Sequence, residues 1–118
     1  MTLRKIDVLK IDKDCVVGKD LLQDWVRLIV LPTCRAYGVE VTSVETCPSP
    51  RKGFHVYIPI DRSIHAETAW RLQFLLGDDC QRVSLNRARW SAGFSGWNKL
   101  FEKEDAPLGV VYRNGFVT

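Results

Sequence analysis

The sequence predicts an α+β domain in which helices cover one face of a mainly antiparallel sheet. Two segments, residues 6–14 and 54–60, alternate apolar and polar side chains at the period of two that is typical of half-buried strands. Between and after them, apolar residues recur at the three- and four-residue spacing of an amphipathic helix. At 118 residues the chain is long enough to bury one core, so we expect a single domain over residues 1–118.

The elements are expected in the order strand, helix, strand, strand, helix, helix, strand. Gly38 and Gly77 are the points at which the first two helices are expected to end. The dipeptide Asn114-Gly115 favours a tight hairpin in the last strand segment. Strands are expected at residues 3–14, 39–46, 54–60 and 108–117, with a turn at 61–63, and helices at 19–37, 64–76 and from 78 or 79 to about 92.

Composition and charge narrow the class of protein. Hydrophobic residues make up 46% and charged residues 26% of the chain, which is ordinary for a water-soluble globular domain. The formal net charge of +3 is too small to identify a nucleic-acid-binding protein by itself. No apolar run reaches the roughly 18 residues that span a membrane, and the N-terminus lacks the apolar region of a signal peptide. We therefore expect a cytoplasmic protein without a membrane partner.

The four cysteines bear on redox chemistry and metal binding. Cys15, Cys34, Cys47 and Cys80 are scattered along the chain, and no two of them form a C-x-x-C pair. Structural zinc sites usually draw their ligands from such closely spaced pairs. We interpret the cysteines as reduced thiols of an intracellular protein rather than as disulfides or zinc ligands.

The alternation in the first and third strands brings candidate metal ligands together. If Leu9 and Ile11 face the helices, Asp12 and Asp14 project from the opposite, open face of the sheet. The same reasoning places His55 on that open face. Two carboxylates two residues apart at the end of a strand suit a hard divalent cation, here Mg²⁺ or Mn²⁺. The alternative reading is a pair of solvated acidic residues at a turn.

A candidate phosphate site precedes the third strand. The run from Ser49 to His55 contains a basic pair, Arg51 and Lys52, followed by Gly53. Glycine lets backbone amides and cations approach a phosphate closely. The same residues are also compatible with an exposed loop tip, and a lone histidine in a strand is often structural.

Three arginines of the third predicted helix are candidate contacts to a nucleic-acid backbone. Arg82, Arg87 and Arg89 carry positive charge beside the apolar residues of that helix. A solvated helix face paired with neighbouring acidic residues explains the same pattern.

The order of these segments resembles that of the archaeo-eukaryotic primase, or primase–polymerase, superfamily. The first motif of that family, apolar residues leading into D-x-D, is matched by Val8-Leu-Lys-Ile-Asp12-Lys-Asp14. Its second motif, often written S-G-R-R-G-x-H at the start of a strand, is matched by Ser49-Pro-Arg-Lys-Gly53-Phe-His55. The resemblance covers roughly residues 6–90.

The resemblance implies a site and an activity within the predicted fold. The order of the elements is itself close to a ferredoxin-like or RNA-recognition-motif (RRM-like) topology, which leaves one sheet face free for a ligand. Asp12 and Asp14 would bind the metal ions, and His55, with Arg51 or Lys52, would contact the phosphates of a nucleoside triphosphate. The implied chemistry is two-metal, DNA-dependent nucleotidyl transfer in a replication protein of the kind that a virus or plasmid encodes, working with nucleic acid and other replication proteins.

The resemblance leaves the activity open, because the family's third motif supplies a further carboxylate. The nearest similar run in this chain has Asn86 at that place. Two alternatives follow: a non-catalytic nucleic-acid-binding module, and a small protein-interaction domain. The run Lys52-Gly-Phe-His-Val-Tyr57 also loosely resembles the RNP1 motif of RNA-recognition domains, but His55 and Val56 fit that motif poorly.

Overall fold

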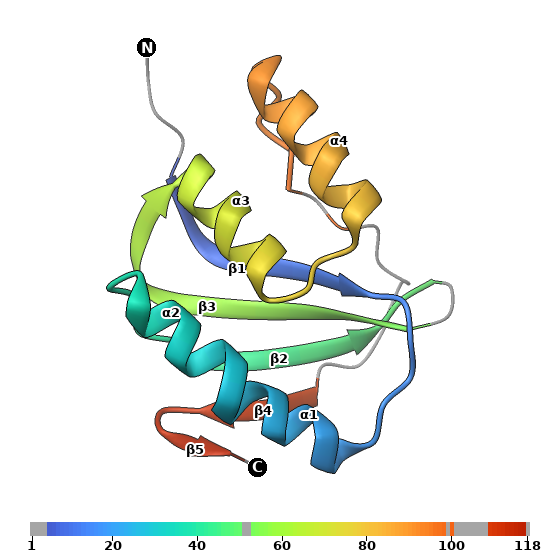
Figure 1. Cartoon of the computed structure of the whole chain (residues 1–118), viewed down its shortest axis with the longest axis vertical. Helices are drawn as coiled ribbons and strands as arrows, with labels where there is room; N and C mark the ends of the chain where they lie inside the picture. The colour runs from blue at the N-terminus through green and yellow to red at the C-terminus, as the bar shows by residue number, and fades with distance from the viewer. Residues whose placement is uncertain (1–4, 51–52, 99, 101–108, 118) are drawn as a thin grey trace.

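The computed structural model describes residues 5–50, 53–98, 100 and 109–117. The chain has an α+β fold in which helices pack against a five-stranded antiparallel sheet (Figure 1), so the predicted fold class is confirmed. Within the described ranges, no helix has the length and apolar character needed to cross a membrane.

The elements follow one another in the predicted order. The first helical stretch is continuous but contains a π-helical segment, which is labelled η1. The elements are β1 (Lys5–Lys13), α1 (Lys19–Trp25), η1 (Val26–Val30), α2 (Leu31–Ala36), β2 (Ser43–Pro48), β3 (Phe54–His65), α3 (Ala66–Leu75), α4 (Cys80–Ser91), β4 (Gly109–Arg113) and β5 (Phe116–Val117).

Two boundaries differ from the sequence-based prediction. Residues 61–63, predicted as a turn, belong to β3, because the strand continues until Ile64 and His65 pair with the start of β1. The second strand begins at Ser43, later than predicted, and reaches Pro48. The hairpin expected around Asn114 and Gly115 is present between β4 and β5, and both residues have positive φ angles.

The strand order is β1-β3-β2-β4-β5. The RRM-like arrangement has the last strand beside the first, whereas here β4 pairs with β2. Strand β1 therefore lies at an edge of the sheet and pairs only with β3 among the described strands. This difference determines what surrounds the candidate site.

The core lies between the sheet and the helices. Leu9 and Ile11 of β1 and Val56 and Ile58 of β3 are fully buried and belong to the main hydrophobic cluster. Helices α1, α2 and α3 lie over this face, and α4 lies beyond β1 (Figure 1). The predicted face of each strand is thus confirmed, because the apolar members of the alternation point to the helices.

Side chains of residues in and between α3 and α4 form hydrogen bonds with the backbone groups on the outer edge of β1. The backbone N–H of Lys10 donates to Gln73 Oε1 at 3.0 Å, and the N–H of Asp12 donates to Asp78 Oδ1 at 2.9 Å. Arg82 Nη1 donates to the carbonyl oxygen of Lys10 at 3.0 Å. An edge strand left unpaired and buried would be costly, so these side chains act as a substitute for a neighbouring strand.

Candidate functional site

Asp12 and His55 face each other across two neighbouring strands. They are paired positions in the antiparallel register of β1 with β3, so their side chains lie on the same face of the sheet. The distance between His55 Nε2 and Asp12 Oδ1 is 3.7 Å. That distance is an ion-pair distance and is longer than a hydrogen bond. The structure therefore brings together the two residues that the sequence placed on one face.

The pair belongs to a row that runs across three strands. Cys47 of β2 is the partner of His55 on its other side, and it is buried. In the adjacent row, Tyr57 lies between Lys10 and Glu45. This face of the sheet thus carries an acid, an imidazole, a thiol and a phenol next to one another.

The face that we expected to be open is closed at His55. The His55 side chain is 4% exposed, whereas the side chain of Asp12 is 35% exposed. The Tyr57 hydroxyl is also shielded from solvent and has no hydrogen-bond partner among the described residues. The Asp12 carboxylate is therefore more accessible from solvent than the His55 imidazole beside it. This geometry corrects the expectation that His55 lies on an open sheet face.

Asp14 does not complete a metal centre with this pair. It follows the last residue of β1 and is exposed. In the part of the chain that the structure describes, no three His, Cys, Asp or Glu side chains converge in a way that would hold a metal ion. Mg²⁺ is often bound by only one or two protein carboxylates together with the phosphates of a substrate. Of the two aspartates, Asp12 is the one that the structure brings next to His55, and its side chain is 35% exposed.

The loop between β2 and β3 lies against the end of β1. The backbone N–H of Ser49 donates to the carbonyl oxygen of Gly53 at 3.3 Å and closes the loop. Gly53 has a φ of +103°, and a Cβ atom there would lie 2.0 Å from the carbonyl oxygen of Lys13. The glycine is thus needed for the close approach of the two strands. The predicted phosphate contacts Arg51 and Lys52 lie outside the described residues.

Arg82, a predicted nucleic-acid contact, lies inside the protein. Its side chain is 9% exposed and pairs with Asp78. The guanidinium also donates to the backbone and side-chain oxygens of Asn98, at 2.6 and 2.8 Å. All of these partners are protein groups, so the Arg82 guanidinium is engaged inside the fold, which does not favour the predicted contact with a phosphate.

The other two predicted arginines do not form one cationic surface with it. Arg87 is exposed, and its guanidinium lies over the rings of Trp70 and Trp90, 5.1 and 5.0 Å from their centroids. It also lies 3.5 Å from a carboxylate oxygen of Glu67. Arg89, on the same helix, is half-buried.

Most arginines in the described ranges have an acidic neighbour. Each arginine there except Arg89 lies within ion-pair distance of an aspartate or glutamate. Local pairing reduces the field that attracts a polyphosphate backbone. The arginines of the described ranges therefore offer little unpaired positive charge to a nucleic-acid backbone.

Lys13 is a feature that the functional interpretation of the sequence overlooked. It shares the core face of β1 with Leu9 and Ile11, and its Nζ donates to the carbonyl oxygens of Leu76 and Gly77 at 3.2 and 3.0 Å. Burial lowers the pKa of Lys13. The negative charges of Cys15 and Asp78 act in the opposite direction, but their effect is smaller. The sequence does carry a signal for this feature, because Lys13 follows Leu9 and Ile11 at the two-residue spacing that places it on the core face.

In comparisons with protein-family models, curated proteins and solved structures, the chain has no match. The case for a function therefore rests on the arrangement of Asp12 and His55 beside the loop that ends at Gly53.

Proposed function

We propose that this chain is a replication-associated, primase–polymerase-like protein that binds a nucleoside triphosphate together with Mg²⁺ or Mn²⁺. The proposal rests on one observation, the cross-strand pairing of Asp12 with His55 at the end of β1. The two residues come from the two motifs on which the resemblance depends.

Asp12 is the proposed contact to the cation. Its carboxylate is partly exposed, and its backbone is held by the hydrogen bond from its N–H to Asp78. The carboxylate therefore projects from an ordered backbone and offers an oxygen ligand without further ordering of the strand. The bound cation would neutralise charge on the triphosphate oxygens.

His55 is assigned a positioning role. Because it is buried and its Nε2 lies 3.7 Å from Asp12 Oδ1, it would limit the orientations of the carboxylate rather than contact the ligand directly. The phosphates would lie on the loop side of Asp12, where Ser49 and Gly53 close the turn. Arg51 and Lys52 directly precede Gly53 in the sequence and supply the positive charge that phosphates require.

The proposal covers binding and does not extend to nucleotidyl transfer. Two-metal transfer needs more carboxylates than the described residues bring together around Asp12. Asn86, which stands at the place of the family's further acid, is fully buried, and its amide group donates to Asn98 Oδ1 at 3.4 Å. The described residues thus support recognition of a metal–nucleotide complex.

Calorimetric titration tests this proposal with Mn²⁺ alone, a nucleoside triphosphate alone, and both together. We expect the two ligands to bind together far more tightly than either alone, because the phosphates complete the coordination shell. Asp12→Asn should weaken binding of the combined ligands by about tenfold or more. The control is Glu40→Gln, which removes one acidic charge away from the site. Glu40 lies beside Asp61, and Asp61 is six residues from His55 along β3.

A second variant separates positioning from direct contact. If His55 acts through Asp12, His55→Asn should weaken binding in the wild-type background and add little to Asp12→Asn. Unchanged binding in Asp12→Asn would contradict the proposal. A steep salt dependence without any metal requirement would instead support a nucleic-acid-binding module, and the absence of both would leave a protein-interaction domain.

A further inference from the structure

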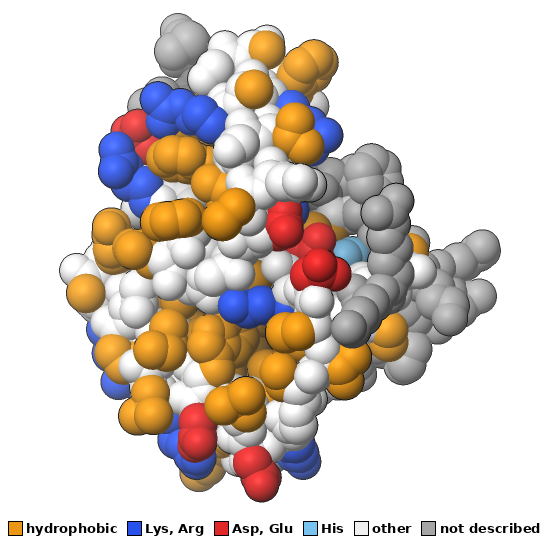
Figure 2. Space-filling view, turned by 45° about the vertical axis from the view of Figure 1, so that its right-hand side comes forward, with side chains coloured by type: hydrophobic (Ala, Val, Ile, Leu, Met, Phe, Trp, Pro, Cys, Tyr) orange, Lys and Arg blue, Asp and Glu red, His pale blue; other side chains and the backbone are white. Residues whose placement is uncertain are grey.

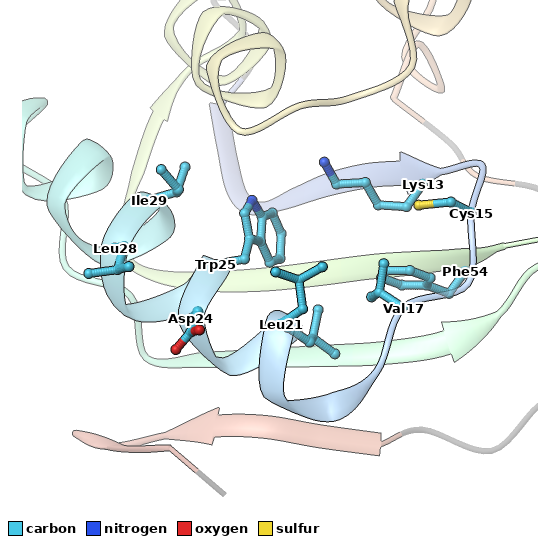
Figure 3. Close-up of a pocket in the computed structure, with 10 residues that line it drawn as sticks. Lys13, Cys15, Val17, Leu21, Asp24, Trp25, Leu28, Ile29 and Phe54 are labelled. Atoms are coloured by element: carbon cyan, nitrogen blue, oxygen red, sulfur yellow. The ribbon is translucent and has the colours of Figure 1, made fainter.

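An apolar hollow of about 410 Å³ lies between the start of the first helix and the sheet. Figure 3 shows Leu21 and Trp25 projecting from the helix toward Lys13 of β1 and Phe54 of β3. The hollow lies over the helix-covered face of the sheet, because Lys13 follows Leu9 and Ile11 in the alternation. The site proposed at Asp12 belongs to the opposite face, so the two features are independent.

The hollow lies at the end of a row of β1 side chains that face the core. The first two positions of that row, Leu9 and Ile11, are fully buried. The third position is Lys13, and its partner in the register is Phe54. A charged residue replaces the apolar side chain that the pattern calls for, and the space above it is left unfilled.

The Lys13 ammonium is positioned rather than free to swing into solvent. Two of its N–H groups donate to the carbonyl oxygens of Leu76 and Gly77, and Nζ lies 5.1 Å from the centroid of the Trp25 ring. An ammonium carries three N–H groups, so one remains beyond these two hydrogen bonds. This places a fixed positive charge at the wall of an apolar space.

The other charged residue that lines the hollow is already neutralised. Asp24 forms an ion pair with Arg27 at 3.0 Å. Lys13 is the cationic residue among those that line the hollow, and its charge favours an anionic group.

Large apolar side chains surround the opening. Leu21 and Leu28 are 61% and 69% exposed, and Figure 2 shows hydrophobic side chains gathered over this side of the molecule. Leu28 comes from the π-helical segment η1. Segments of π-helix are rare and are frequently found at functional sites.

We propose that this hollow binds a small amphiphilic carboxylate, whose apolar part packs between Leu21, Trp25 and Phe54 and whose carboxylate pairs with Lys13. A small molecule fits because the volume lies in the range of small-molecule sites, and because Lys13 is among the residues that line the hollow. A carboxylate there offsets the cost of burying the ammonium.

Three probes with a ten-carbon chain and different head groups test the proposal: decanoate and decyltrimethylammonium below their critical micelle concentrations, and decan-1-ol below its solubility limit. Amide and indole resonances in NMR spectra report the location and affinity of binding. We expect decanoate to bind about tenfold more tightly than decan-1-ol, and the cation to bind most weakly. Shifts should concentrate at residues 13–29 and at Phe54.

Lys13→Met should remove the preference for decanoate and leave decan-1-ol binding unchanged, whereas Lys13→Arg should retain the preference. Lys19→Met is the matched control, since Lys19 is exposed and does not line the hollow. If Lys13→Met fails to fold, Leu21→Gln serves instead, because it should weaken binding of decanoate and decan-1-ol alike. Equal affinity for all three probes, no binding, or shifts centred outside the hollow would each overturn the proposal.

Discussion

Arg82 and Asp78 form an ion pair inside the protein, against the outer edge of β1. Asp78 accepts the backbone N–H of Asp12, and Arg82 donates to the carbonyl oxygen of Lys10. The pair therefore links α4 to the strand that carries the candidate site. The position of Asp12 depends on this contact as well as on its pairing with β3.

Removing one member of this pair should destabilise the protein strongly. In Arg82→Met, the Asp78 carboxylate remains buried without its cationic partner, and the carbonyl oxygen of Lys10 loses a donor. We expect the free energy of unfolding to fall by about 3–5 kcal/mol. Urea denaturation followed by tryptophan fluorescence measures this change.

The control for this prediction is an exposed arginine in an ion pair. Arg35→Met breaks the contact of Arg35 with Glu40 on the surface and should change stability by less than about 1 kcal/mol. The double variant Asp78→Asn/Arg82→Met should recover part of the loss, because it buries no unpaired charge. If Arg82→Met is as stable as the wild type, the ion pair does not stabilise the edge strand β1.

The burial of Arg82 illustrates why part of the structure was not predictable from the sequence. Local pattern placed this residue on a solvated helix face, but its partner Lys10 lies 72 positions away in the chain. Burial became favourable only because β1 is an edge strand whose backbone groups need partners. Strand order is a property of the whole fold, and no local pattern encodes it.

The candidate site was predictable in one respect and not in another. Alternation placed Asp12 and His55 on one face correctly, because a period of two is a local property of each strand. Their direct pairing depends on the register between β1 and β3, which the alternation does not fix. The burial of His55 depends on tertiary packing, so the expectation of an open face was wrong at that position.

Substitution of Gly53 should disturb both the loop and the end of β1. Gly53→Ala forces an L-residue into a positive φ and places Cβ against the carbonyl oxygen of Lys13. We expect a loss of about 1–2 kcal/mol from the backbone conformation, with a further loss from the clash. Thermal unfolding measures the loss. Gly96→Ala, where nothing lies within 4 Å of the new Cβ, should change stability little, and equal effects of the two substitutions would argue against the close approach.

The four free cysteines should fall into two classes of reactivity. Cys15 and Cys80 are exposed, whereas Cys34 and Cys47 are buried. Burial, with a smaller effect of Glu40, raises the pKa of the Cys34 thiol to about 11, so little thiolate forms at about pH 8. Alkylation by iodoacetamide, followed by mass spectrometry of peptides, should modify Cys15 and Cys80 first. Denaturant should make all four react, and rapid modification of Cys34 in the folded protein would contradict its burial.

The half-buried ammonium of Lys13 should make stability depend on alkaline pH. Because burial lowers the pKa of Lys13 below 10.5, the folded state releases this proton at a lower pH than the unfolded state does. In the window between the lowered pKa and 10.5 the unfolded state binds more protons, so the contribution of Lys13 to stability rises with pH.

The measurement is the difference in free energy of unfolding between the wild type and Lys13→Met, from neutral pH toward pH 10.5. Taking the difference removes the titration of tyrosines and other lysines that are common to both proteins. We expect the difference to shift in favour of the wild type as the pH rises, and the corresponding difference for Lys19→Met, an exposed position, to shift less. A difference for Lys13→Met that stays constant or moves against the wild type would show that the ammonium is not desolvated, and would remove the electrostatic basis for an anionic ligand in the hollow.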